Sequence, residues 1–168
     1  KAKEFLEKNH LQGYSIAKYR YGLKYNGKVV SIATFSNARF NRNIQYELQR
    51  FANKIDYIVI GGFSKLFQHF VKNYNVKSIV SYCDIAYFEG IIYQQNKFQY
   101  SHRSLPNYKY FHSKNKLLLY SRNQFQKHKL EKQLRNFNPN LTEYENMKAN
   151  GYDRIWDCGN DVYVWCDR

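Results

Sequence analysis

Residues 46–66, YELQRFANKIDYIVIGGFSKL, decide the fold of this chain. Residues 44–53 alternate polar and apolar side chains, as a half-buried strand does. After the Gly61-Gly62 pair, residues 64–75 place apolar side chains at helical spacing. A strand therefore leads through a glycine-bearing loop into a helix, whose free N–H groups and positive dipole would suit a pyrophosphate. A plain strand-to-helix turn is the alternative interpretation of the same pattern.

Strand-like and helix-like segments alternate on both sides of this stretch. Asn26-Gly27 between two strand-like runs is a strong hairpin signal. The alternation predicts an α/β (α+β) domain around one mixed sheet, with a basic helix and a short helix–hairpin at its C-terminal end. The expected strands are 19–24, 29–35, 44–53, 78–83, 108–112, 117–120, 155–157 and 162–165, the last two as a turn-linked pair. The expected helices are 1–9, 64–75, 88–96, 123–136 and a capped segment from 142 to 150.

The charge is the strongest compositional signal. The net charge is +14, and residues 8–142 hold 22 Lys or Arg against five acids. Such a chain attracts phosphate backbones and binds them in a salt-dependent way. An AT-rich genome would explain the many Tyr and Asn residues, but it would not suppress acids. We therefore expect DNA as a partner.

The cysteines and the apolar runs bear on the compartment. Cys83, Cys158 and Cys166 show no pairing pattern, which favours a reducing compartment, the cytoplasm. No apolar run reaches the ~18–20 residues that span a bilayer, so we expect no membrane association. No His and Cys stand at zinc-ligand spacing, and we expect no metal. We interpret residues 1–168 as a single domain excised from a longer protein, with a C-terminal extension at 114–168.

A second stretch extends the pattern of the first. Ser81-Tyr82-Cys83-Asp84 ends a buried strand, and residues 90–98, GIIYQQNKF, form a helix that runs into another strand. This succession resembles the GNAT acetyltransferase superfamily, in which a strand and a Gly-rich loop hold coenzyme A and a later helix carries an acid tyrosine. The resemblance implies a GNAT-like central mixed, mostly antiparallel sheet flanked by helices, and acetyl-CoA or a related acyl-CoA as cofactor. The cofactor-binding residues that it implies are Phe51, Ala52, Asn53, Ile60, Gly61, Gly62, Phe63, Ser64 and Lys65.

Two phage-type groups look closest within that superfamily. The chain resembles the Mom-like DNA-modifying proteins at His10-Leu11-Gln12-Gly13, at residues 81–84 and at residues 90–98. It resembles, almost from end to end, the C-terminal domain of phage Vsr-like or HNH homing endonucleases, for example at ENMKANGYDRIWDCGN, residues 145–160. These resemblances imply a bacterial or phage-infected cell, and a nuclease domain in the same full-length chain. Phe63 and Lys97 depart from the GNAT pattern, where a small residue and a glycine are usual.

The Mom-like resemblance implies Tyr93 and Asp84 as catalytic residues, with Tyr93 as the acid. Glu47 is a candidate base, and either Asp84 or Glu47 would orient or deprotonate the nucleophile. The alternatives are a core tyrosine for Tyr93, a loop cap for Asp84, and an ion pair with Arg50 for Glu47. The candidate nucleic-acid-binding residues are His10, Arg39, Arg42, Arg122, Lys127, Lys129, Lys132 and Arg135.

Two functions from different classes follow from this sequence. In the first, the domain transfers an acyl-CoA-derived group to a DNA base. In the second, it is a non-catalytic DNA-binding domain that targets a homing endonuclease. A metal-dependent nuclease needs clustered carboxylates, and residues 8–142 hold few acids, so the domain itself is not expected to cut.

Overall fold

The computed structural model describes residues 1–167, and the chain divides into two compact units. Unit 1 comprises Lys1–Arg103 and Asp161–Arg168, and unit 2 comprises Ser104–Asn160. Each unit has its own sheet, one of six strands and one of three. The expected α/β (α+β) class, with a mixed and mostly antiparallel sheet, is confirmed. The extension expected at 114–168 spans parts of both units.

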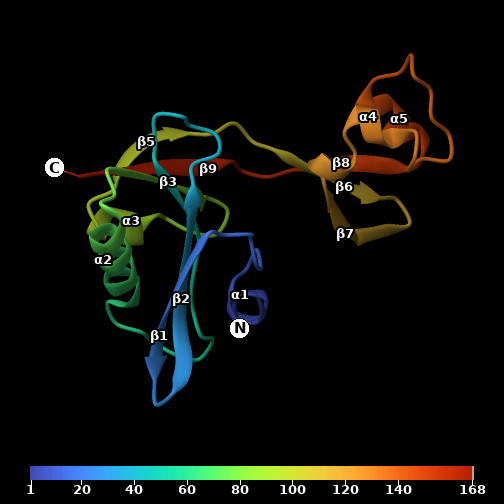
Figure 1. Ribbon diagram of the computed structural model, residues 1–168. Helices are drawn as coiled ribbons and strands as arrows, with labels where there is room; N and C mark the ends of the chain where they lie inside the picture. The colour runs from blue at the N-terminus through green and yellow to red at the C-terminus, as the bar shows by residue number, and fades with distance from the viewer. Residues whose placement is uncertain (168) are drawn as a thin grey trace. The chain divides into compact units, whose positions relative to one another are not determined.

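The sheet of unit 1 has the strand order β1-β2-β3-β4-β9-β5 (Figure 1). Its strands are β1 (Tyr19–Tyr25), β2 (Lys28–Asn37), β3 (Tyr46–Asn53), β4 (Ser78–Asp84), β5 (Gln99–Arg103) and β9 (Asn160–Cys166). The β1–β2 hairpin is confirmed, and both Asn26 and Gly27 have positive φ, which a two-residue hairpin turn requires. β3 runs antiparallel to β2 and parallel to β4. This parallel pair makes the sheet a mixed one.

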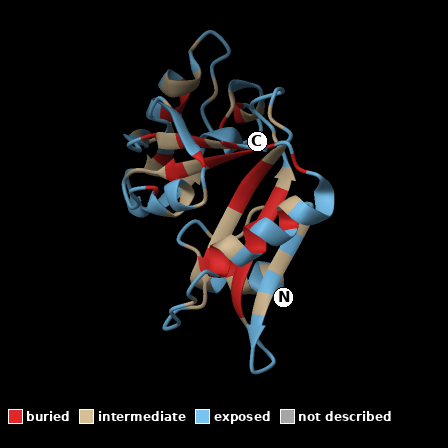
Figure 2. Ribbon diagram, turned by 90° about the vertical axis from the view of Figure 1, so that its left-hand side faces the viewer, coloured by how far each residue is buried: buried red, intermediate tan, exposed pale blue. Residues whose placement is uncertain are grey.

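Helices cover both faces of this sheet. α1 (Ala2–Asn9) buries Leu6 against Ile32 and Ala52, whereas α2 (Gly62–Tyr74) packs on the opposite face (Figure 1). α3 (Ile91–Gln95) follows β4. Because both faces are covered, the middle of β2 is buried at six consecutive positions, as Figure 2 shows along the central strands. The main core contains Phe35, Leu48, Phe63, Phe67, Phe70, Phe98 and Trp165.

Unit 2 is a three-stranded antiparallel sheet with helices on one face. The strand order is β7-β6-β8, with β6 (Tyr108–His112), β7 (Asn115–Ser121) and β8 (Tyr152–Trp156). The helices are η1 (Arg122–Gln124), α4 (Lys127–Leu130) and α5 (Glu143–Ala149). The expected capping box at the start of α5 is confirmed between Thr142 and Glu145. The core of this unit contains Tyr110, Phe125, Leu130, Leu134 and Met147.

Two sequence-based expectations for the C-terminal region are wrong. Residues 123–136 do not form one basic helix, because only η1 and the four-residue α4 are helical there. Glu131 is the one acid among Lys127, Lys129, Lys132 and Arg135, and like charges three residues apart, such as Lys129 with Lys132, do not stabilise a helix. Leu130 and Leu134 are nevertheless buried as expected. Residues 155–157 and 162–165 do not pair with each other, because β8 pairs with β6 and β9 pairs with β5.

The structure also bears on the cysteines and on membrane-spanning helices. All three cysteines are free, with Cys83 buried and the other two exposed. Within residues 1–167, no helix combines the length and the apolar character that crossing a membrane takes.

Candidate functional site

A cavity of about 610 Å³ lies in unit 1 between β3 and β4. The two strands pair at only two positions, Tyr46 with Ile79 and Glu47 with Val80. Beyond these positions, residues 48–53 and residues 81–84 line the cavity instead of pairing with each other. β2 continues to pair with β3 as far as Asn53, so only the edge of β3 that faces β4 is left open. The open edge offers backbone donors and acceptors to a ligand.

A β-bulge sits on β3 at the point where the cavity begins. Leu48 pairs with Phe35 and Arg50 pairs with Thr34, so Gln49 is an extra residue without a partner on β2. Bulges redirect side chains and are common beside active sites. Here the bulge lets both Gln49 and Arg50 reach the cavity wall.

Arg50 brings a positive charge to the cavity. Its Nε donates to the carbonyl of Gly13 at 3.1 Å and its Nη1 to the carbonyl of Gln49 at 2.7 Å. Burial, and then the charge of Arg39, lower the pKa of Arg50. Within the described part of the chain, no carboxylate forms an ion pair with Arg50. A half-buried guanidinium held by carbonyls is suited to an anionic ligand group.

His10, Gln12 and Asp84 form a polar corner of the same cavity. Gln12 donates from Nε2 to Asp84 Oδ2 at 3.2 Å, and its backbone N–H donates to His10 Nδ1 at 3.0 Å. Burial, followed by the charge of Arg50, lowers the pKa of His10 to about 4. The ring is therefore neutral at pH 7, and because Nδ1 accepts, the proton is assigned to Nε2. His10 is thus a hydrogen-bond donor to the cavity and carries no charge for a phosphate.

Tyr93 stands on α3 at the other side of the cavity. Ser81 Oγ donates to its hydroxyl oxygen at 3.1 Å, and the ring of Tyr163 stacks on its ring with centroids 5.0 Å apart. Burial raises the pKa of Tyr93 to about 12. Because Ser81 supplies the hydrogen of that bond, the phenolic hydrogen of Tyr93 is free to donate to a ligand. The group therefore fits the acid role expected from the sequence and not a base role.

Gly90 makes the position of Tyr93 possible. It caps α3 with φ +75°, a left-handed conformation that favours glycine. A Cβ at Gly90 would collide with the ring and hydroxyl of Tyr163, the residue that stacks on Tyr93. This glycine thus lets the backbone approach the tyrosine pair closely.

Glu47, the candidate base, does not line the cavity. Its carboxylate is 3% exposed and accepts two hydrogen bonds from Arg39, from Nη2 at 2.9 Å and from Nε at 3.3 Å. The ion pair was expected with Arg50, but the guanidinium of Arg50 donates to the carbonyls of Gly13 and Gln49 instead. Arg39, expected to bind nucleic acid, is the actual partner and also donates to Gln49 Oε1 at 3.2 Å.

The expected cofactor-binding residues divide into two groups. Phe51, Ala52 and Asn53 line the cavity, and so does Phe63. Ile60, Gly61, Gly62, Ser64 and Lys65 do not line it. Gly61 caps α2 in a left-handed conformation, so the expected loop does open the helix as the sequence indicates. Gly62 lies beside Asn53, because a Cβ there would stand 3.4 Å from Asn53 Oδ1. The start of α2 is therefore adjacent to the cavity end of β3.

Two buried polar atoms of cavity-lining residues have no hydrogen-bond partner. They are Gln49 Nε2, a donor, and Asn53 Oδ1, an acceptor. Leaving such a group unpaired costs about 1–3 kcal/mol, so a ligand that pairs with it gains binding energy. Each of the two atoms is a candidate partner for a polar group of a ligand.

The expected nucleic-acid-binding residues are placed on different elements. Arg42 is exposed in the loop before β3. In unit 2, Lys129 donates to the carbonyl of Asn123 at 2.7 Å. Of the other expected residues in unit 2, Arg122, Lys127, Lys132 and Arg135 are exposed. Arg122 forms an ion pair with Glu143, with Nε 3.8 Å from Oε1. Among residues 1–167, no three His, Cys, Asp or Glu side chains gather in a way that could hold a metal ion.

Sequence reasoning missed Arg50, Gln49 and Ser81 as parts of the site. The bulge that exposes the first two has no signature in a single sequence, and Ser81 reads as an ordinary strand residue. The comparisons with known proteins add no further residue, since no protein-family model and no curated protein matches the chain.

Proposed function

We propose that unit 1 is an acyltransferase of the GNAT type that modifies a base amine of DNA. The observation that carries the proposal is the cavity between the diverging strands β3 and β4, which brings Tyr93, Asp84 and three of the expected cofactor-binding residues, 51–53, to one place. Asn53 at the end of β3 lies beside Gly62 at the start of α2. This supports the expectation that the strand edge and the helix N-terminus hold the same cofactor.

The residues present fit an acyl-CoA. Residues 51–53 on the open edge of β3 would hold the amide-bearing arm, for which Gln49 Nε2 and Asn53 Oδ1 are the unpaired partners. The start of α2, with the exposed Lys65 in its first turn, would hold the pyrophosphate. Acyl-CoA supplies an activated thioester when bound.

In this proposal one side chain of the cavity donates a proton and another accepts one. Tyr93 is protonated at neutral pH and, as the acid, would donate its phenolic hydrogen to the sulfur that leaves when the thioester C–S bond breaks. Asp84, which accepts a hydrogen bond from Gln12, would take a proton from the amine of the DNA base. Neutral His10 would orient that base by donating a hydrogen bond from Nε2. A base in duplex DNA would have to be flipped out of the stack to reach these groups.

A second function, a non-catalytic DNA-binding domain, is favoured by a specific observation. Phe63 stands where the GNAT pattern has a small residue. Its ring is buried, with its centroid 5.1 Å from that of Phe51 and 6.4 Å from that of Tyr93. A ring at this place occupies volume that a cofactor would need. The two functions make opposite predictions for acyl-CoA binding.

The test is a calorimetric titration of the chain with acetyl-CoA, at moderate salt so that unspecific charge attraction is screened. Saturable binding that weakens about tenfold in Arg50→Met and several-fold in Lys65→Ala supports the transferase. Lys72→Ala is the matched control, because Lys72 is an exposed lysine in the last turn of the same helix. Modified nucleosides would then be sought in co-expressed DNA by mass spectrometry. Absence of binding would sink the transferase and leave the DNA-binding function.

A further inference from the structure

An arginine in unit 2 is held by aromatic rings. The guanidinium carbon of Arg154 lies 3.7 Å from the ring centroid of Tyr144, 4.9 Å from that of Tyr108 and 5.6 Å from that of Trp156. Tyr108 is opposite Trp156 in the β6–β8 pair, and Arg154 is two residues before Trp156, so these three side chains share one face of the sheet. Arg122 adds a second guanidinium over Tyr108, at 5.0 Å.

Arg154 has no carboxylate partner in the described structure. The neighbouring Asp153 is engaged elsewhere, because its Oδ1 accepts from the hydroxyl of Tyr144 at 3.0 Å and from the backbone N–H of Arg154 at 2.8 Å. Stacking fixes the plane of a guanidinium but leaves its N–H donors at the edge of that plane. Arg154 therefore presents an oriented, unpaired fork, the geometry that suits a phosphate.

Trp156 presents an exposed aromatic face beside this arginine. It is 56% exposed, and its contact with Tyr108 is edge-on, with centroids 4.9 Å apart and planes at 66°. The guanidinium of Arg154 lies over one face of the indole, 5.6 Å from the ring centroid, and more than half of the residue stays exposed. An exposed, oriented tryptophan is a platform for a nucleobase.

The charge of unit 2 fits an anionic polymer. Residues 104–160 contain ten Lys or Arg and five acids. The two acids closest to the aromatic cluster are engaged within it, since Glu143 accepts from the hydroxyls of Tyr108 and Tyr110 at 3.1 and 3.0 Å, and Asp153 accepts from Tyr144. Glu143 Oε1 also lies 3.8 Å from Arg122 Nε, so Arg122 has a carboxylate partner, whereas Arg154 forms no ion pair within residues 1–167.

From this arrangement we infer that Arg154 and Trp156 form a binding site for a nucleic-acid strand at an unpaired base. Trp156 stacks on the base, and Arg154 forms two hydrogen bonds to the adjoining phosphate. The inference deepens the proposed function and rests on the nucleic-acid association stated there. It is independent of acyl-CoA binding, and it places strand recognition on residues outside the basic run 114–135.

The test is binding of a fluorescently labelled single-stranded oligonucleotide and of the matching duplex to the full chain, followed by anisotropy at two salt concentrations. We expect Trp156→Ala to weaken single-strand binding about tenfold and duplex binding about twofold or less, because stacking needs an unpaired base. We expect Arg154→Lys to weaken single-strand binding about fivefold, because lysine keeps the charge but loses the planar fork.

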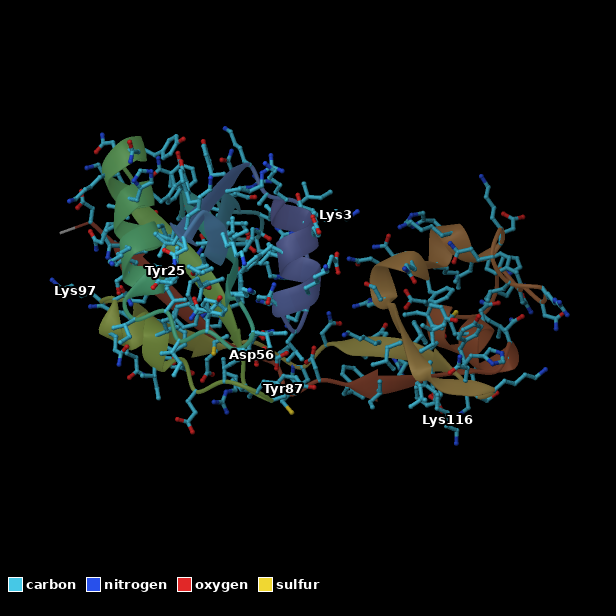
Figure 3. All side chains as sticks on the ribbon, turned by 90° about the horizontal axis from the view of Figure 1, so that it is seen from below. Lys3, Tyr25, Asp56, Tyr87, Lys97 and Lys116 are labelled. Atoms are coloured by element: carbon cyan, nitrogen blue, oxygen red, sulfur yellow. The ribbon has the colours of Figure 1, made fainter. Side chains whose placement is uncertain are left out.

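Lys116→Ala is the matched control for charge. Lys116 lies on β7, is exposed and projects away from the unit (Figure 3). This variant removes a whole charge, yet we expect a smaller loss than for Arg154→Lys, about twofold, with a shallower salt dependence. Thermal unfolding of each variant shows whether unit 2 still folds. Quenching of intrinsic fluorescence by the oligonucleotide should be reduced in Trp156→Phe, which keeps a ring and provides a second readout.

Each outcome decides a different statement. If the wild type binds in a salt-dependent way and Trp156→Ala binds equally well, the site is overturned while the DNA association of the proposed function stands. If the wild type binds no nucleic acid at low salt, both fail. If an acidic peptide competes for Arg154 while DNA binding is unaffected by Arg154→Lys, the site takes a protein ligand and the inference is overturned.

Discussion

The two units differ in where aromatic rings and arginines meet. In unit 1 the rings fill the core, as in the stack of Phe35 on Phe70 with centroids 4.0 Å apart, and Arg39 and Arg103 are fixed by carboxylates. In unit 2 rings and arginines meet near the surface around Arg154, which no carboxylate fixes in the described residues. A ring-filled core supports a cavity for a small ligand, whereas an oriented surface of rings and cations suits a polymer. The difference agrees with the proposal that unit 1 binds a small molecule and unit 2 a nucleic-acid strand.

The largest expected effect tests whether buried aromatic rings stabilise the core of unit 1. Phe70 is fully buried and contacts the rings of Tyr19, Phe35 and Tyr46. Phe70→Ala should therefore lower the free energy of unfolding by about 3–5 kcal/mol. The chain has two tryptophans, so in a Trp156→Phe background the buried Trp165 reports on unit 1 during urea unfolding.

The matched change in unit 2 is Trp156→Ala, which removes an exposed ring. We expect it to change the free energy of unfolding by less than about 1 kcal/mol. If this loss equalled that of Phe70→Ala, Trp156 would be a packing residue, and the contrast between the units would be lost.

A smaller but functionally sharper effect is expected at Tyr93. Tyr93→Phe removes the phenolic hydrogen and keeps the ring that stacks on Tyr163. If unit 1 is a transferase, the rate constant of acyl transfer should fall about 10²- to 10³-fold, as for loss of a general acid, while acetyl-CoA affinity stays within about twofold. The measurement is transfer of labelled acyl groups to DNA under single-turnover conditions. Tyr100→Phe, at an exposed tyrosine on β5, is the control and should leave the rate unchanged; a rate for Tyr93→Phe equal to wild type would place the acid elsewhere.

Substitutions at Arg39 and Glu47 test whether Glu47 is a structural partner of Arg39 or the catalytic base. Arg39→Ala leaves the buried carboxylate of Glu47 without its partner and should cost about 2 kcal/mol of stability. Glu47→Gln removes the buried charge as well and should cost less. A Glu47→Gln protein that unfolds normally but loses activity as fully as Tyr93→Phe would show that Glu47 is the base after all.

Local signals in the sequence were sufficient for most elements. The Asn26-Gly27 hairpin, the capped start of α5 and the strand–glycine–helix succession at 46–74 each depend on neighbours a few residues apart, and all are present. The exposed run around Ile60, which is 88% exposed, shows that an apolar stretch before glycines does not have to be buried.

Pairings between distant segments were not accessible in this way. β8 and β9 are close in sequence, yet they join different sheets, because β8 pairs with β6, 40 to 48 residues earlier, and β9 with β5, 58 to 65 residues earlier. The bulge at Gln49 depends on its register with β2, and the site role of Arg50 depends on that bulge. The Arg154 cluster likewise assembles from three separate segments around Tyr108, Tyr144 and Trp156.

The smallest expected effect is a pH dependence that only the enclosed site should have. Burial and Arg50 lower the pKa of His10 from an ordinary 6.5 to about 4. The unfolded chain therefore binds a proton at His10 more readily than the folded chain does, and acid favours unfolding. The stabilisation is complete above pH 6.5 and is lost as the pH falls toward 4. The urea midpoint of unit 1 should thus fall less steeply over this range in His10→Gln than in the wild type. His128→Gln, at an exposed histidine of unit 2, should keep the wild-type slope. Equal slopes in His10→Gln and the wild type would mean that His10 is as well solvated as a surface histidine, and the polar corner beside Asp84 would not be an enclosed site.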